Sequence, residues 1–182
     1  NDLDIPKGLI NFVYGKGETV GKHLSAHSGI DMISFTGSVE TGSLIMQEAG
    51  KNITKVNLEL GGKAPVIVFD DADIDLLIEG VRDFGYYNAG QDCTAACRMF
   101  VDKKIYEKVV SDLTSAVNTI GYGNDDDSKN DIPPLITAEH LDRVSSFVET
   151  AKSLKHVEIT TGGSSVGDKG NFYKPTVIAG AN

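Results

Sequence analysis

The sequence predicts an α/β fold with a largely parallel sheet, a class in which strands and helices alternate along the chain. Short strand-like runs alternate with helical patterns over all 182 residues, without an internal repeat. Residues 65–69 form a near-continuous apolar run, typical of a strand covered on both faces. Residues 105–120 read as a long amphipathic helix with Val109, Leu113 and Val117 on one stripe.

The first part of the chain contains five expected elements, several of them ended by glycine. Strands are expected at 10–13, 32–35 and 55–60, and helices at 19–27 and 39–49. Val20 and Leu24 lie one helical turn apart, and Gly50 ends the second helix. Gly61 and Gly62 permit backbone angles closed to other residues, so a domain junction and a tight turn inside one domain both fit there.

The alternation continues through the second part of the chain. Strands are expected at 65–69, 98–101 and 156–160, helices at 73–87, 105–120 and 138–152, and extended chain at 173–178. Two connecting segments are rich in loop-forming residues: 124–130 is polar and acidic, and 162–170 is rich in Gly and Ser.

Composition excludes several classes of partner. The formal net charge of −9 and the absence of a basic patch argue against nucleic acid. No apolar run is long enough for a membrane span, and residues 1–4 are acidic without a signal-peptide pattern. Two cysteines do not make a disulfide framework, so we expect a reducing, cytoplasmic setting. Without an initiator Met, the natural start is expected upstream.

Cys93 is a candidate nucleophile because small residues around it leave room for a substrate to reach the sulfur. A helix beginning near Cys93 would favour the thiolate through its N–H groups. The carboxylate of Asp92 opposes this, since a neighbouring negative charge disfavours a thiolate. From spacing alone, a buried structural cysteine remains the simpler interpretation.

Glu59 is a candidate general base, as a lone carboxylate in an apolar stretch at the end of a strand. An apolar setting favours the neutral form of a carboxylate, as a base near neutral pH requires. A glutamate facing solvent on an alternating strand is the simpler local interpretation. Lys63 is a possible partner, although a surface lysine is the default.

Residues 35–42 join a strand to a helix and are a candidate phosphate site. Gly37 lets the backbone approach a ligand, and the hydroxyls of Thr36 and Ser38 with the helix N–H groups suit a pyrophosphate. The G-x-G-x-x-G fingerprint is absent. A Ser N-cap followed by Glu40 in the first turn explains the same residues.

Three metal-like patterns fail. Asp71, Asp73 and Asp75 look like the opening of a calcium loop, but the required Gly and bidentate Glu are missing further on. His23 and His27 lie one turn apart without a clear third ligand. The two cysteines are not spaced as C-x-x-C and have no His near them. We therefore expect no bound metal.

Five motifs in order resemble the aldehyde dehydrogenase superfamily over nearly the whole chain. They are P-x-G-x-x-N-x-V at 6–13, F-T-G-S-x-x-x-G at 35–42, E-L-G-G-K at 59–63, G-Q-x-C at 90–93, and G-G with P-T-V at 162–163 and 175–177. Each motif alone is weak, but five in sequence are strong. The run at 90–98 is most similar to γ-aminobutyraldehyde and betaine-aldehyde dehydrogenases.

The resemblance implies an NAD-dependent, or NADP-dependent, oxidation of a small aldehyde, with Cys93 as nucleophile and Glu59 as base. The thiolate adds to the carbonyl, hydride leaves for the nicotinamide, and water activated by the base hydrolyses the thioester. The Cys93 backbone N–H would be one oxyanion donor. It further implies cofactor contacts near the pyrophosphate and the nicotinamide carboxamide, made by Thr36, Gly37, Ser38, Leu60 and Gly61.

The resemblance also implies an incomplete enzyme. Residues 1–60 would be the end of a Rossmann-like NAD(P)-binding domain, and 61–182 the start of an α/β catalytic (thiol) domain. The family's second oxyanion donor, its ribose contacts and its oligomerisation strand lie outside this chain. We expect the isolated chain to be inactive and the full-length protein to be a homo-oligomer. Residues 133–134 are Pro-Pro where the family usually has Gly-Pro, which we expect to alter only a loop.

Substrate and function class stay open at this point. Asp92 beside the nucleophile would favour an ammonium-bearing aldehyde by charge attraction, unless it points away and caps the next helix. An amidase-type hydrolase using Cys93, Glu59 and Lys63 is one alternative, and a non-catalytic protein on the same fold is another.

Overall fold

A computed structural model of the chain describes residues 5–167 and 169–181, except for the side chain of residue 127. The acidic start at 1–4, together with residues 168 and 182, lies outside the described residues. The chain divides into two compact units, Asn1–Gly61 and Gly62–Asn182, with the two adjacent glycines at the division. Helices and strands alternate in both, which confirms the expected α/β class.

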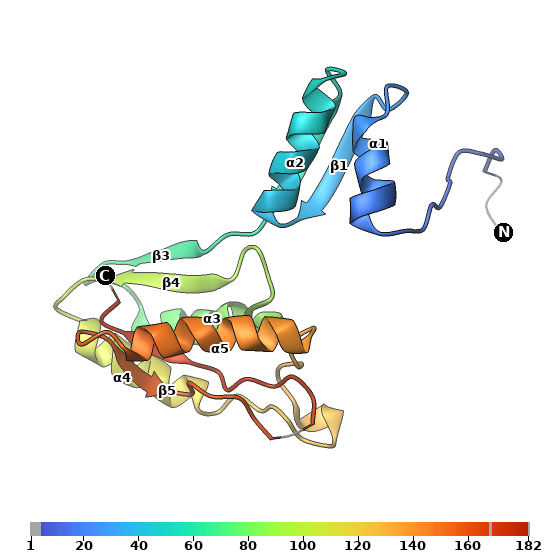
Figure 1. Cartoon of the computed structure of the whole chain (residues 1–182). Helices are drawn as coiled ribbons and strands as arrows, with labels where there is room; N and C mark the ends of the chain where they lie inside the picture. Colours follow the sequence, from blue (N-terminus) through green and yellow to red (C-terminus); the bar gives the residue numbers. More distant parts are fainter. Residues whose placement is uncertain (1–4, 168, 182) are drawn as a thin grey trace. The chain divides into compact units, whose positions relative to one another are not determined.

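Unit 1 is built on one pair of parallel strands. Its elements are the π-helical turn η1 (Gly17–Gly21), α1 (Lys22–Ala26), β1 (Met32–Gly37), α2 (Val39–Gly50) and β2 (Lys55–Leu60). Strands β1 and β2 pair from Met32 opposite Lys55 to Gly37 opposite Leu60. Figure 1 shows β1 between α1 and α2. Helix α2 packs on both strands.

A close approach between α2 and β2 explains the glycine at the end of the F-T-G-S-x-x-x-G motif. Side chains of β2 alternate between exposed and partly buried, with Leu60 on the partly buried set. A methyl group added to Gly42 would lie 2.8 Å from Leu60 Cδ2. Because carbon atoms do not pack that closely, any larger residue would push the helix from the strand or displace the leucine.

The expected strand at 10–13 is wrong. Residues 11–16 have no regular secondary structure, and the side chain of Phe12 is 80% exposed. A strand requires a neighbour for its N–H and C=O groups. Among the strands of the described residues, none pairs with this segment.

Unit 2 contains two further strand pairs with helices between them. Its elements are β3 (Ala64–Val68), α3 (Ile74–Gly85), η2 (Tyr87–Gly90), β4 (Ala96–Val101), α4 (Tyr106–Val117), η3 (Asp127–Lys129), α5 (Ala138–Lys152), β5 (Glu158–Thr161) and β6 (Val177–Ala179). Strands β3 and β4 are parallel, whereas β5 and β6 are antiparallel. Helix α3 packs on β4 and α4, and α4 packs on β5 and β6 (Figure 1).

Unit 2 has two core clusters: a larger one between α3 and α4, and a smaller one that contains Leu135, Val148 and Tyr173. The expected stripe of Val109, Leu113 and Val117 is buried against Ile78 and Val81 of α3, which confirms the amphipathic pattern. None of the helices in the described part of the chain is long and apolar enough to cross a membrane.

The expectation that β3 is covered on both faces is wrong. Val66 and Val68 are turned inward, but Pro65 is exposed and Ile67 is 66% exposed. The inner face has α3 against the sheet, whereas the outer face is left exposed within the described part of unit 2. A continuous apolar run in the sequence therefore does not show whether a strand is covered on one face or on both.

The G-G and P-T-V motifs are explained by a close chain crossing. Gly162 and Gly163 both have φ of +77°. A methyl group on Gly162 would lie 2.1 Å from the Pro175 carbonyl oxygen, so only glycine fits. The Gly163 N–H donates to Thr176 Oγ1 at 2.9 Å. The two motifs thus fix the loop after β5 to the segment that leads into β6.

Candidate active site

Cys93 lies in an irregular turn between η2 and β4, and its side chain is exposed. Cys97, at the start of β4, is also a free, exposed cysteine. No helix of the described residues begins near Cys93, because the chain from Ala96 onward forms β4, where a strand was expected at 98–101, and pairs with β3. The thiol therefore faces solvent from a turn and receives no helix dipole.

Asp92 organises the turn through the residue after the cysteine. Its Oδ1 accepts hydrogen bonds from the Thr94 N–H at 2.9 Å and the Thr94 hydroxyl at 3.0 Å. The backbone and hydroxyl bonds from Thr94, with a smaller one from the Cys93 side chain, hold the pKa of Asp92 below its ordinary value. Asp92 therefore caps this turn, as the alternative of a capping role allowed, although the segment that follows is β4 and not a helix.

Gly62 also lies beside this turn. A methyl group built on Gly62 would be 3.6 Å from the Cys93 carbonyl oxygen, an ordinary contact distance. Both residues belong to unit 2. The second glycine of the E-L-G-G-K motif therefore runs alongside the G-Q-x-C motif, although the two are distant in the sequence. Lys63, which follows Gly62, is exposed.

In unit 1, the other candidate residues meet at the carboxyl edge of the β1–β2 pair. Thr36 is opposite Glu59, and Gly37 is opposite Leu60. Because the strands are parallel, these residues end at the same edge, where open α/β sheets bind their ligands. Ser38 follows directly as the first residue beyond β1. The register thus brings the candidate base and the candidate cofactor residues together.

The exposure of this edge differs from what the sequence suggested for Glu59. Thr36, Ser38 and Glu59 are all exposed, so the expected apolar setting of the carboxylate is wrong. Strand alternation is the reason: Leu58 and Leu60 take the partly buried positions on β2, and Glu59 between them faces the other way. The simpler interpretation, a glutamate facing solvent on an alternating strand, describes unit 1 correctly.

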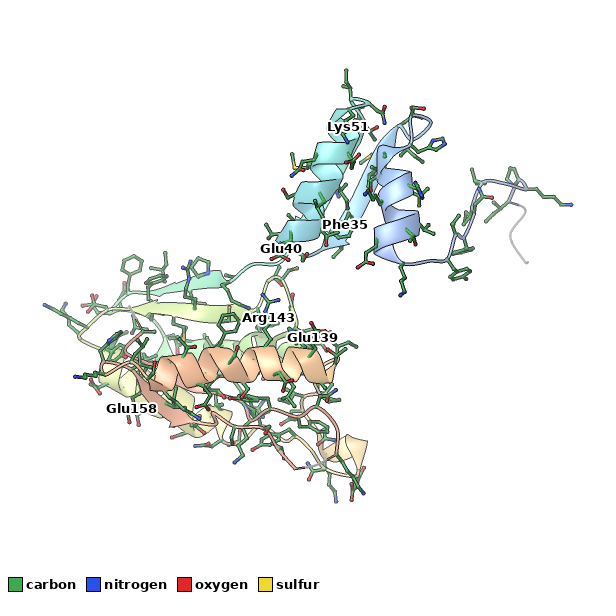
Figure 2. The ribbon with its side chains drawn as sticks, in the orientation of Figure 1. Phe35, Glu40, Lys51, Glu139, Arg143 and Glu158 are labelled. Carbon is green, nitrogen blue, oxygen red and sulfur yellow. The ribbon has the colours of Figure 1, made fainter. Side chains whose placement is uncertain are left out.

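The strand–helix junction forms the Ser N-cap that the sequence allowed. Ser38 Oγ accepts the Thr41 N–H at 3.1 Å and donates to Thr41 Oγ1 at 3.0 Å. Gly37 is the last residue of β1 instead of part of the turn. Figure 2 shows Phe35 of β1 and Glu40 of α2 at one end of the unit, with Lys51 at the far end of α2. Among the described residues, no group of three or more His, Cys, Asp or Glu side chains is placed to hold a metal ion.

Sequence reasoning missed the role of Gln91. Its side chain hydrogen-bonds to the backbone of Asn88 and to a segment more than forty residues later. The available signal was the Gln of the G-Q-x-C motif, but nothing in the local pattern identifies its partners.

Comparison with known proteins identifies the family. The sequence profile of the aldehyde dehydrogenase family matches residues 1–182. The chain is 43% identical over 180 residues to lactaldehyde dehydrogenase of Escherichia coli (strain K12), covering 98% of this chain and 37% of that protein. It is 38% identical over 185 residues to betaine aldehyde dehydrogenase of Bacillus subtilis (strain 168), covering 100% and 38%.

Solved structures agree. The crystal structure of betaine aldehyde dehydrogenase from Staphylococcus aureus in complex with NAD⁺ has a TM-score of 0.88 and 40% identity, over 96% of this chain and 35% of that one. The NAD⁺ complex of an aldehyde dehydrogenase from Bacillus cereus has a TM-score of 0.89 and 38% identity, over 96% and 35%. This chain belongs to the aldehyde dehydrogenase family. It spans little more than a third of the length of these relatives.

Proposed function

We propose that the full-length protein containing this chain oxidises an aldehyde to the carboxylic acid with NAD⁺, or alternatively NADP⁺. The matched relatives are aldehyde dehydrogenases, and two of the similar structures were solved with NAD⁺. Family membership also argues against the amidase-type hydrolase that Cys93, Glu59 and Lys63 allowed on sequence alone.

The observation that carries the proposal is how the backbone links Glu59 to Cys93. Gly62 runs beside the Cys93 carbonyl within unit 2. Only two residues lie between Glu59 and Gly62, so their Cα atoms are at most about 11 Å apart, whatever the arrangement of the two units. The chain connection therefore permits the Glu59 carboxylate to reach the nucleophile turn. A base that serves a cysteine-bound intermediate must come within hydrogen-bond reach of the attacking water.

Cys93 attacks the aldehyde carbonyl as the thiolate and forms a thiohemiacetal. Its exposed position on a turn leaves the sulfur accessible to substrate. The Cys93 N–H stabilises the oxyanion as one donor. NAD(P)⁺, when bound, supplies the acceptor for the hydride. Glu59 then removes a proton from the water that hydrolyses the thioester, which releases the acid and regenerates the thiol.

The carboxyl edge of β1–β2 suits the dinucleotide. Thr36 and Gly37 end β1 there and Ser38 follows them, while Leu60 ends β2 and Gly61 follows it, so hydroxyls and glycine backbone lie at one edge. The N-terminus of α2 adds backbone N–H groups that favour a pyrophosphate. In this proposal residues 1–60 belong to the cofactor domain, and residues 61–182 to the catalytic domain.

For the substrate, we propose an ammonium-bearing aldehyde. The hydrogen bonds that lower the pKa of Asp92 keep its carboxylate ionised beside the thiol, where it attracts a cation. The relatives do not decide this, because both lactaldehyde and betaine aldehyde dehydrogenases are among them. The test compares kcat/KM of the full-length protein for 4-aminobutyraldehyde and butyraldehyde. A preference for the charged aldehyde that is lost in Asp92→Asn supports the proposal, whereas a preference for butyraldehyde contradicts it.

The activity itself is tested with the two cysteines as a matched pair. Both are free and exposed, and they are four positions apart. In the full-length protein, Cys93→Ala should lower NADH formation by roughly 10³-fold or more, since it removes the bond-forming atom. Cys97→Ala should leave the rate within about threefold. Full activity in Cys93→Ala would exclude the cysteine mechanism and support a non-catalytic role for this site.

A further inference from the structure

We propose that Gln91 is a positioning residue for the nucleophile turn, whose carboxamide holds Cys93 in place by pairing with the backbone of residues 134–136. The inference rests on the proposed role of Cys93 and extends it to a residue that does not touch the reacting atoms.

The turn before Cys93 needs support because its backbone is unusual. Asn88, Ala89 and Gly90 have φ values of +51°, +56° and +74°, three successive left-handed residues. Glycine accepts this conformation freely, and asparagine accepts it better than most residues. Alanine at such an angle costs about 1–2 kcal/mol. Contacts outside the turn must offset that cost, or the segment would relax to ordinary angles.

A reciprocal pair of side-chain bonds closes the turn on itself. Asn88 Nδ2 donates to the Gln91 carbonyl at 3.1 Å, and Gln91 Nε2 donates to the Asn88 carbonyl at 3.0 Å. The backbone N–H of Gln91 also donates to the Asn88 carbonyl at 3.1 Å. These three bonds fix the conformation of residues 88–91. They do not connect the turn to the rest of unit 2.

The Gln91 side-chain amide also holds the turn against another segment of unit 2. Its Oε1 accepts the Ile136 N–H at 2.9 Å, and its Nε2 reaches the Pro134 carbonyl at 3.4 Å. The amide oxygen and nitrogen thus pair with the N–H and the C=O of two residues that are two positions apart. A neighbouring β-strand would pair with the same two groups. The amide is the uncharged side chain that presents both groups from one end.

The partner segment is itself anchored. Leu135, between the two contacted residues, is buried, and its N–H donates to the Asn171 carbonyl at 2.9 Å. Ala89 packs against both core clusters of unit 2. Beyond the cysteine, Ala95 is 2% exposed. The Cys93 turn is therefore fixed on both sides while its thiol stays exposed, which sets the direction of the sulfur and of the Cys93 N–H.

Three substitutions at Gln91 separate positioning from packing in the full-length protein. Gln91→Met keeps the length of the side chain but loses its hydrogen bonds, and Gln91→Ala loses both the length and the side-chain hydrogen bonds. Gln91→Glu keeps the acceptor for Ile136 but sets a carboxylate oxygen against the Asn88 and Pro134 carbonyls. The control is Gln47→Ala, at the exposed glutamine on α2. We expect kcat to fall roughly 10- to 100-fold in all three Gln91 variants, as small misplacements of a reacting group do. KM for NAD⁺ should stay unchanged, because the proposed cofactor residues lie in unit 1, at the ends of β1 and β2.

A pH profile supplies the readout that a purely structural role would not move. When protonated, the Gln91→Glu carboxyl regains a donor for a facing carbonyl. Its kcat relative to wild type should therefore recover as the pH is lowered from about 8 to about 5, toward the ordinary glutamate range. Gln91→Met should show no such recovery.

The outcomes distinguish this inference from the proposed function. If Cys93→Ala is inactive but Gln91→Met has the kcat of wild type, the positioning role is excluded and the function stands. If Gln91→Glu shows no relative recovery at low pH, the hydrogen-bond account is excluded. If Cys93→Ala is active, the proposed function fails before the Gln91 variants are considered.

Discussion

The two units build their parts of the candidate site in different ways. In unit 1, the register of β1 and β2 places Thr36, Gly37, Glu59 and Leu60 at one edge through repeated backbone pairing. In unit 2, Cys93 sits in an irregular turn that depends on individual side chains. A strand pair distributes its support over many bonds, whereas a turn depends on a few. Single substitutions should therefore disturb unit 2 more than unit 1.

The largest expected effect is at Gly162, where a substitution tests most directly whether unit 2 is the less tolerant unit. Gly162→Ala introduces a side chain at a φ of +77° and places it 2.1 Å from a carbonyl oxygen. Strain and overlap together should lower the free energy of unfolding of unit 2 by about 3 kcal/mol. Hydrogen exchange of β5 and β6 in the full-length protein measures it. Unchanged protection of these strands would show that the crossing does not constrain the chain.

The matched substitution in unit 1 is Gly42→Ala, and its effect should be smaller. The new methyl group meets the flexible end of the Leu60 side chain at 2.8 Å, and the helical backbone accepts alanine. Overlap costs about 1–3 kcal/mol, and the better helix propensity of alanine offsets about 1 kcal/mol of that. Hydrogen exchange of β2 should report a net loss of about 1 kcal/mol. A loss as large as that at Gly162 would contradict the greater tolerance assigned to unit 1.

Removing the cap of α2 is a further test of unit 1. Ser38→Ala loses the bond from the Thr41 N–H at 3.1 Å and should destabilise the helix by about 1 kcal/mol. Ser38→Asp, which keeps a capping oxygen, is the control and should lose much less. Exchange rates of the first turn of α2 measure both. If the two variants behave alike, the cap does not stabilise the junction.

The smallest expected effect concerns acid stability at Asp92. Its pKa is lowered in the folded state, chiefly by Thr94, from an ordinary value of 3.8. The stabilisation is therefore present above about pH 4 and is lost as the pH falls through the lower folded pKa. Asp92→Asn should be less stable than wild type near neutral pH, and the gap should close in acid. If the difference in stability between wild type and Asp92→Asn grows on acidification, the carboxylate of Asp92 does not stabilise the folded state.

Local signals in the sequence predicted most helices and strands. Features that depend on contacts between segments distant in the sequence could not be predicted in this way. Helix α5 begins after the Thr137 cap at the expected residue, and β2 has the expected bounds, because capping and alternation are local. The predictions of a strand at 10–13 and of a second covered face on β3 failed because each depends on what lies alongside. Gln91 was missed for the same reason, since its partners at 134 and 136 are brought close by folding.

In the proposed mechanism, Cys93 carries the reacting group while Glu59 activates the water that releases it. Intact-protein mass spectrometry of full-length Glu59→Gln, mixed with aldehyde and NAD⁺, tests it most directly, with Glu139→Gln as the control. We predict an acyl adduct that accumulates on Cys93 in Glu59→Gln with about one NADH formed per site, and no accumulation in Glu139→Gln. Steady turnover in Glu59→Gln without an adduct, or an adduct on Cys97, would contradict the account.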